Sequence, residues 1–121
     1  MRRIGVISDI HADEAALTQA LDLLTREKAD SIICAGDLVE KGTDGDAVVA
    51  LLRSHRIPCV RGNHDRDAVS NQQWLRENTD FPDHPLLLKD ETLDFLQSLP
   101  LTLTASLDGV KLLLAHGTPS A

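Results

Sequence analysis

The sequence contains few of the residues that characterise several functional classes. Its 121 residues include two cysteines, one tryptophan, two phenylalanines and no tyrosine. Two cysteines cannot form the disulfide framework of a small secreted domain. Three aromatic rings are too few for a platform that stacks single-stranded nucleic acid. No apolar stretch approaches the roughly 20 residues of a membrane span. We therefore expect a cytoplasmic protein with no targeting segment and no membrane partner.

Positive charge is also scarce, because 12 Lys and Arg residues stand against 19 Asp and Glu residues, for a formal net charge of −7. This balance argues against general nucleic-acid binding and against an anionic membrane surface. It does not exclude a local phosphate site, since a bound cation inverts the local field. The hydrophobic share of 42% is typical of a globular domain. We expect residues 1–121 to form one domain.

Short β-branched runs alternate with helical patterns in the first half of the chain. The expected strands cover residues 3–8, 31–35 and 58–61, and the expected helices begin near residues 13 and 48. Apolar residues at i, i+4 and i+7 define the inner face of the first helix. The β-α-β-α-β order predicts a parallel sheet with right-handed crossovers, and hence an α/β fold class.

The second half of the chain is expected to contain two helices and a hairpin. These elements are a helix over 67–78, a helix capped by Asp90, and strands over 101–106 and 110–115. Trp74 and Leu75 are expected to be packing residues of the first of these helices. Asp108-Gly109 between the two strands is a strong hairpin signal.

Polar residues of metal-binding type follow the expected strands. They are Asp9 and His11, Asp37, the trio Asn63-His64-Asp65, and His116. The carboxyl ends of neighbouring parallel strands share one edge, so five of these residues are expected to meet there, namely Asp9, His11, Asp37, Asn63 and His64. Whether His116 joins them depends on how the hairpin packs, which periodicity leaves open. Each residue alone is compatible with turn chemistry, but their joint placement favours a metal site.

The residue types suit a pair of metal ions. Imidazole and carboxylate suit zinc, manganese or iron, and an amide oxygen suits harder cations. A carboxylate can bridge two cations with its two oxygens. Two metals about 3.5–4 Å apart can hold a phosphoryl group for in-line displacement.

The motifs that contain these residues resemble those of a known family. Asp9-Ile10-His11, Gly36-Asp37, Gly62-Asn63-His64-Asp65 and His116-Gly117 look like the successive motifs of the calcineurin-like metallophosphoesterases. The chain is most similar in spacing to small bacterial and archaeal phosphodiesterase-like members. The resemblance implies a two-sheet αββα sandwich that begins with the β-α-β-α-β unit. It also implies hydrolysis of phosphomonoesters or phosphodiesters on a small molecule or nucleotide. Two divalent metal ions are implied as cofactors, with Mn²⁺ favoured and Zn²⁺, Fe, Ni²⁺ or Mg²⁺ also suitable.

The resemblance further implies a role for each residue. Asp9 and His11 would bind the first metal, Asp37 would bridge both metals, and Asn63 and His116 would bind the second. His64 would stabilise charge at the phosphate or protonate the leaving oxygen, with Asp65 orienting it. A hydroxide bridging the two metals would be the nucleophile.

One departure from the family pattern is visible. The family continues with a Gly-His-x-His motif, which this chain lacks, and neither His55 nor His84 is a convincing substitute. The resemblance therefore implies a domain that is truncated at its C-terminal end. The hairpin would have an unpaired edge and an apolar face carrying Leu112 and Leu114. A second copy of this chain is one way to cover that edge.

Two functions remain open at this point. One is a metal-dependent phosphoesterase, and the other is a catalytically impaired metal-binding or scaffold module of the same fold. Retention of His64 and Asp65 favours the enzyme, whereas the missing last motif favours the module. A P-loop protein is excluded because no Gly-x-x-x-x-Gly-Lys-Ser/Thr follows a strand. An aspartyl-phosphate phosphatase with Asp9 as nucleophile fits the spacing less well.

The two cysteines have a simpler interpretation. Cys34 and Cys59 lie in apolar runs that are expected to be strands. We expect both to be buried thiols of the core.

Overall fold

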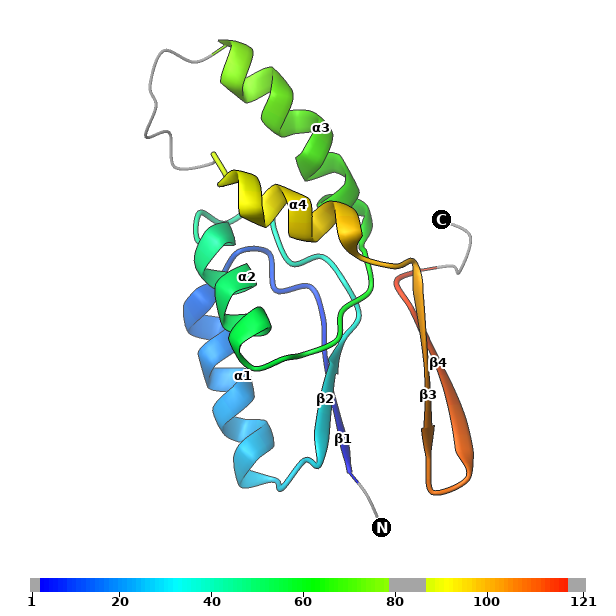
Figure 1. Cartoon of the computed structure of the whole chain (residues 1–121). Coiled ribbons are helices and arrows are strands. Elements are labelled where there is room, and N and C mark those ends of the chain that lie inside the picture. The colour runs from blue at the N-terminus through cyan, green and yellow to red at the C-terminus, as the bar shows by residue number, and fades with distance from the viewer. Residues whose placement is uncertain (1–2, 79–86, 118–121) are drawn as a thin grey trace.

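The computed structural model describes residues 3–78 and 87–117. In chain order the elements are β1 (Ile4–Ile7), α1 (Glu14–Arg26), β2 (Ser31–Cys34), α2 (Gly45–Ser54), α3 (Asn63–Asn78), α4 (Asp90–Ser98), β3 (Thr102–Leu107) and β4 (Val110–Ala115). β1 and β2 pair in parallel, and β3 and β4 pair antiparallel in a second sheet. Helices α1 and α2 lie on one side of β1 and β2, and the β3–β4 hairpin stands on the other (Figure 1). The predicted α/β class is confirmed.

Helix α1 forms where the sequence predicted it. The Asp13 carboxylate accepts a hydrogen bond from the N–H of Ala16 at 3.0 Å and so satisfies one free donor of the first turn. Leu17 and Leu21 are buried on the inner face, one helical turn apart. The helix therefore returns the chain from the end of β1 to the start of β2, as a parallel pair requires.

The third parallel strand is much shorter than predicted. Segment 58–61 runs beside β2 but forms a single parallel bridge, between Cys34 and Cys59. The N–H of Cys34 donates to the carbonyl of Pro58 at 2.9 Å, and the N–H of Val60 donates to Cys34 at 3.0 Å. Proline has no N–H, so Pro58 cannot donate the next hydrogen bond of the ladder to β2, and the pairing ends there. Both thiols are free and buried, as expected.

Helix α3 begins earlier than predicted, at Asn63 rather than at Asp67. Asp65 is the third residue of the helix, and its carboxylate accepts the N–H of Gly62, which precedes the helix, at 2.9 Å. This is half of a capping box and is what stabilises the early start. His64 consequently lies on the first helical turn rather than in a loop.

The buried face of α3 differs from the one that the sequence suggested. Asp65, Ala68 and Gln72 are buried and follow one another at helical spacing. Trp74 lies two residues beyond Gln72, on another face, and is 63% exposed. The prediction that Trp74 is a packing residue of the core is therefore wrong.

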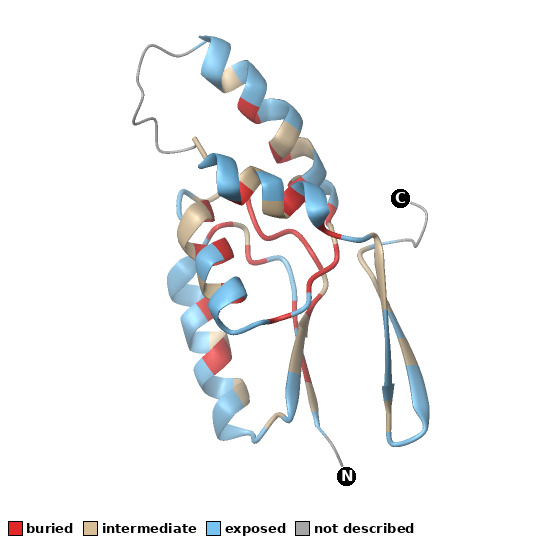
Figure 2. Cartoon of the chain, in the orientation of Figure 1, coloured by how far each residue is buried: buried red, intermediate tan, exposed pale blue. Residues whose placement is uncertain are grey.

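The core lies between the two-stranded parallel sheet, α1, α2 and α4. Its fully buried side chains include Leu17, Leu38, Val48, Leu52 and Leu96. Figure 2 shows buried positions along the inner helix faces and in the segments that follow the strands. These segments carry the predicted site residues, so packing against the core fixes the position of the site. In the described residues, no helix has the length and apolar character to cross a bilayer.

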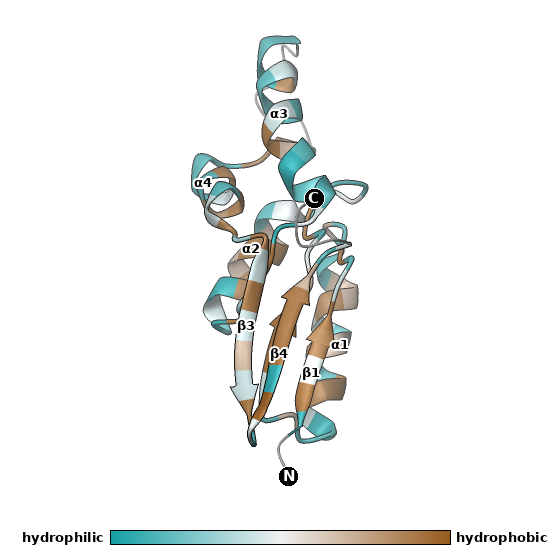
Figure 3. Ribbon diagram, turned by 90° about the vertical axis from the view of Figure 1, so that its right-hand side faces the viewer, coloured by the Kyte–Doolittle hydropathy of each residue, from teal (hydrophilic) through white to brown (hydrophobic). Residues whose placement is uncertain are grey.

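The predicted hairpin is confirmed. Asp108 (φ 49°) and Gly109 (φ 82°) both have left-handed backbone at its turn, as a two-residue type I′ turn requires. Figure 3 shows β4 as a largely hydrophobic strand. Leu112 and Leu114, the expected apolar face, are only half-buried. In the described parts of the chain each of these strands pairs only with the other, so each keeps an unpaired outer edge.

A matched pair of leucine substitutions tests the core. Leu96→Ala should lower the free energy of unfolding by about 2–5 kcal/mol, because it opens a cavity beneath α4. Leu113, which is 62% exposed, serves as the control, and Leu113→Ala should change stability by about 0.5 kcal/mol or less. Urea unfolding followed by circular dichroism measures both. Equal losses would show that α4 does not pack on the core.

Candidate metal centre

Backbone hydrogen bonds join the loop after β1 to the loop after β2. The N–H groups of Asp9, His11 and Ala12 donate to the carbonyls of Gly36, Asp37 and Leu38 at 3.0, 3.0 and 2.8 Å. The two loops thus continue the parallel pairing of β1 and β2 beyond the strands. This places the first two predicted site residues next to the third.

The same two loops contain a cluster of left-handed backbone. It consists of Asp9 (φ 55°), His11 (φ 50°), Ala12 (φ 59°), Asp37 (φ 59°), Glu40 (φ 70°) and Lys41 (φ 72°). Non-glycine residues rarely adopt this conformation, and each instance costs on the order of 1–3 kcal/mol. Such strain persists only where surrounding contacts enforce it, and it concentrates at functional sites.

The buried carboxylate of Asp65 supplies much of that enforcement. Its Oδ1 accepts the N–H groups of Leu38 and Val39 at 2.7 and 3.3 Å, and its Oδ2 accepts those of Asp37 and Gly62, both at 2.9 Å. The side chain is 0% exposed. Burial raises the pKa of Asp65, and the four N–H donors oppose that shift because they favour the ionised form. Asp65 therefore ties the loop after β2 to the start of α3.

Glycine is required at two positions beside Asp37. Gly36 has a φ of +99°, which side-chain-bearing residues rarely adopt. A Cβ on Gly62 would collide with the backbone N and the carboxylate of Asp37. The absence of a side chain at residue 62 is what lets α3 approach the loop after β2 so closely.

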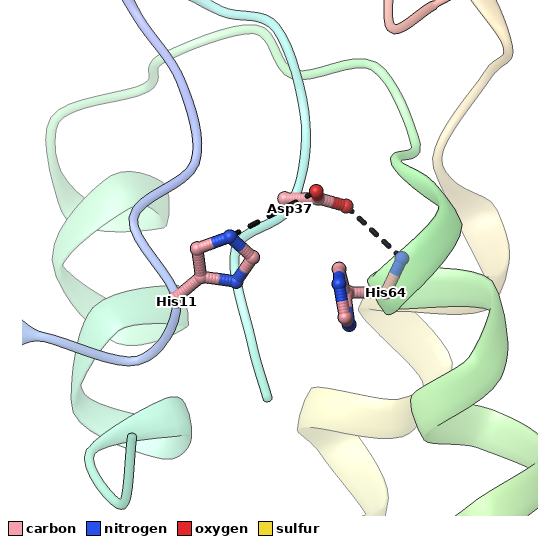
Figure 4. Close-up of side chains that lie close together, drawn as sticks. All are labelled: His11, Asp37 and His64. Atoms are coloured by element: carbon pink, nitrogen blue, oxygen red, sulfur yellow. Dashed lines mark hydrogen bonds and ion pairs between the residues drawn. The ribbon is translucent and has the colours of Figure 1, made fainter. Parts of the chain in front are cut away.

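The carboxylate of Asp37 occupies the centre of the site. It is 3% exposed. Its Oδ2 lies 3.9 Å from Nε2 of His11 and 3.2 Å from Nε2 of His116, and its Oδ1 accepts the backbone N–H of His64 at 3.0 Å. Figure 4 shows Asp37 between the His11 and His64 side chains. Residues from three distant parts of the chain therefore meet at one carboxylate.

Asp9 extends the site towards solvent. Its Oδ1 lies 3.6 Å from Nε2 of His11, and its Oδ2 accepts the Ser8 hydroxyl at 2.6 Å. The Ser8 hydrogen bond and the nearby His116 and His11 lower the pKa of Asp9, although partial burial opposes them. Asp9 is therefore ionised at neutral pH.

The atoms around His116 suit a bound cation. Its Nδ1 lies 2.8 Å from the carbonyl oxygen of Ala35, which only accepts hydrogen bonds, so Nδ1 carries a proton. In the neutral ring, Nε2 then presents a lone pair. That lone pair faces two further acceptors, the Oδ1 of Asn63 at 3.1 Å and the Oδ2 of Asp37 at 3.2 Å. A histidine that donates one N–H to a carbonyl and turns its other nitrogen to acidic oxygens is arranged as metal ligands usually are.

His64 contacts a carboxylate that the sequence did not single out. Its Nδ1 lies 3.1 Å from Oε1 of Glu40, whose Oε2 accepts the side-chain N–H of Asn71 at 2.9 Å. The expected orienting contact from Asp65 is not the one observed, because both oxygens of Asp65 are engaged by backbone N–H groups. The one signal in the sequence was the acidic side chain of Glu40 itself, three positions after Asp37 in a loop that was assigned to turns.

The donor atoms suit two divalent ions. Two groups each place one ligand atom per residue within 4.8 Å of the others, namely His11, Asp37 and His64, and Asp9, Asp37 and His116. Ligand bonds of about 2.0–2.2 Å place the ligand atoms of one ion at most about 4.4 Å apart, which is close to this limit. Asp37 belongs to both groups, as a bridging ligand would. In addition, the buried Nδ1 of His11 has no hydrogen-bond partner among the residues that the structure describes.

Of the two remaining histidines, His55 does not contribute to this site. His55 is exposed and follows the last residue of α2. His84 lies outside the described residues.

Comparison with known proteins identifies the family. The sequence profile of the calcineurin-like phosphoesterases matches residues 2–120, and the chain belongs to this family. An uncharacterised protein of Methanocaldococcus jannaschii is 31% identical over 96% of this chain and 49% of its own length. Serine/threonine-protein phosphatase 1 of Salmonella typhimurium is 32% identical over 66% of this chain and 40% of its own.

A solved structure supports the same fold. A protein under the provisional name diadenosine tetraphosphatase superposes with a TM-score of 0.74 and 25% identity, over 97% of this chain and 50% of its own. The fold is thus that of a metallophosphoesterase, a class of hydrolases. The chain spans about half the length of the relatives it matches.

Substitution of Asp65 tests its structural role. Asp65→Ala removes the acceptor of four buried N–H groups and should lower the free energy of unfolding by about 3 kcal/mol or more. Asp65→Asn keeps one acceptor oxygen and should lose about half as much. Asp67→Ala on the same helix is the control, because half of the Asp67 side chain is exposed. Urea unfolding measures all three, and equal midpoints for Asp65→Ala and Asp67→Ala would contradict the role.

Proposed function

We propose that this chain hydrolyses phosphate esters at a centre of two divalent metal ions built around Asp37. The observation that carries the proposal is the convergence of His11, His116 and the start of α3 on the Asp37 carboxylate. A divalent ion at that carboxylate would pair with the Nε2 atoms of both histidines without either ring being protonated. The family match agrees with this reaction class.

The residues present supply ligands for both ions. In the proposal Asp9 and His11 would hold one ion, Asn63 and His116 would hold the other, and Asp37 would contact both. The two candidate groups divide the side chains differently, since Asp9 lies with His116 and His64 lies with His11. The proposal keeps His64 for proton transfer rather than for binding an ion. Such ions supply positive charge for the phosphate oxygens and bring the pKa of water close to 7. We propose Mn²⁺ because imidazole, carboxylate and amide oxygen together suit an ion of intermediate hardness.

His64 is the proposed proton donor to the leaving oxygen. Glu40 is an acceptor, so Nδ1 of His64 carries a proton in their contact, and Nε2 is then the atom that faces the substrate. For this role the ring must be doubly protonated, so that the Nε2 proton passes to the leaving oxygen and the ring becomes neutral. The edge-to-face contact with His11, with ring centroids 5.0 Å apart, keeps His64 beside the metal ligands. Glu40 acts through His64 as a positioning residue, since it fixes the ring and offsets its charge.

The proposed substrates are small phosphate esters and nucleotides. The negative formal charge disfavours a nucleic-acid polymer, whereas a small ester needs only the local charge of the centre. The name of the neighbour with TM-score 0.74 refers to a nucleotide substrate of that protein. A metal-binding module without turnover is the alternative, and the experiment below separates the two.

Two substitutions separate metal binding from turnover. Asp37→Ala should release both ions, whereas His64→Ala should keep them and lose most of the turnover, by about 10²-fold or more. Manganese is counted by elemental analysis, and turnover is measured with bis(4-nitrophenyl) phosphate. The matched controls are Asp22→Ala and His55→Ala, both at exposed positions. Two bound ions without turnover in the parent chain would support the module, and an active His64→Ala would contradict the assigned role.

A double substitution tests Glu40. Glu40→Ala should lower kcat by about tenfold, with metal content unchanged, because His64 loses its charged partner. In the His64→Ala background the same change should have little further effect, since residues that act as one unit are not additive. Equal effects of Glu40→Ala in both backgrounds would show that Glu40 does not act through His64.

A further inference from the structure

A pocket of about 290 Å³ lies beside the candidate metal centre. Its walls come from the loops after β1 and β2, the start of α2 and residues 68–75 of α3. The apolar lining includes Ala12, Val39, Gly45, Ala68, Trp74 and Leu75. Ligand pockets measure about 300–1,000 Å³, so this one suits a single ring system rather than a whole nucleotide.

The pocket adjoins the residues of the proposed reaction. Ala12 follows His11 directly, and Glu40, which contacts His64, is part of the pocket wall. An open groove of about 840 Å³ runs past Asp9 and His11. The groove and the pocket share Ala12 and residues 41–43, so both open beside the same loop. Glu40 is therefore the residue through which the pocket wall meets the candidate metal centre.

Trp74 gives the pocket its chemical character. It lines the pocket, yet it is 63% exposed, so the fold does not use its ring for packing. An indole face that borders an apolar hollow favours stacking with another planar ring. Glu40 and Asn71 bring polar atoms to the same wall, and a nucleobase presents both a flat face and a polar edge.

We propose that this pocket binds the nucleobase of the substrate, stacked on Trp74. The inference rests on the proposed function, and it specifies the substrate as an extended nucleotide ester, such as a nucleoside polyphosphate, with its base at Trp74 and its scissile phosphate at Asp37 and His64. The extended form is needed because the ten residues of α3 from His64 to Trp74 span about 15 Å. Trp74 is then a specificity-determining residue. It contributes affinity for the base and none for the phosphate.

Intrinsic fluorescence tests the pocket directly, because Trp74 is the one tryptophan of the sequence. Adenosine, which has no phosphate, should quench the emission of the metal-free chain with a saturating curve. Ribose 5-phosphate, which has no base, should not. Leu113→Ala, at an exposed position of the hairpin, should leave the curve unchanged. Linear quenching like that of free tryptophan would overturn the proposal.

Inhibition gives an independent measurement. Adenosine should compete with bis(4-nitrophenyl) phosphate, and Trp74→Ala should raise its inhibition constant by about 5- to 150-fold, the range found for one lost base stack. Trp74→Phe keeps an aromatic face and should stay close to the parent. Inhibition by ribose 5-phosphate should not change in either variant. An unchanged adenosine constant in Trp74→Ala would overturn the proposal.

The two proposals fail in different ways. Asp37→Ala should abolish hydrolysis but keep saturable quenching by adenosine. Saturable quenching in a parent chain that hydrolyses nothing would overturn the proposed function and leave the pocket assignment standing. Hydrolysis without saturable quenching would overturn the pocket assignment alone.

Discussion

The site depends on one buried carboxylate that has no part in the proposed metal binding or proton transfer. Asp65 accepts four backbone N–H groups, three from the loop after β2 and one from Gly62 at the start of α3. It compensates donors that would otherwise be buried without partners. By holding these two segments together, it brings Asp37 against the backbone of His64. The strained, left-handed loops are maintained by this clamp and by the core beneath it.

On this scaffold the chain gathers more acceptors than donors. Asp9, Asp37 and Asn63 present oxygens, and His116 commits one N–H to the carbonyl of Ala35. Acceptor oxygen atoms that lie close together in a partly buried site repel one another unless a positive charge lies between them. A divalent ion among these groups would neutralise the carboxylates of Asp9 and Asp37 and would leave His116 free to bind through Nε2. The hairpin takes part as well, since it delivers His116 to the same carboxylate.

Much of the arrangement was predictable because it follows from local signals. The β-branched runs, the Asp13 cap and the Asp108-Gly109 turn each determine an element nearly alone. The proximity of Asp9, His11 and Asp37 follows from parallel pairing. The ligand roles assigned to the site residues, and the single truncated domain over residues 1–121, stay predictions.

Tertiary contacts decide most of the features that the sequence did not predict. Helix α3 starts at Asn63 because Asp65 caps it while also binding a distant loop. The third strand is reduced to one bridge because Pro58 offers no N–H. Helical periodicity could not tell that Trp74 would face a pocket. The contact of Glu40 with His64 depends on how α3 docks against the loop after β2, which spacing along the chain does not reveal.

The central claim is that Asp37 joins two metal ions. Electron paramagnetic resonance of the chain loaded with two equivalents of Mn²⁺ tests it most directly, because ions about 3.5–4 Å apart that share a ligand couple magnetically. The account predicts an exchange-coupled multiline spectrum. A spectrum of isolated six-line Mn²⁺ alone, at full occupancy, would contradict it.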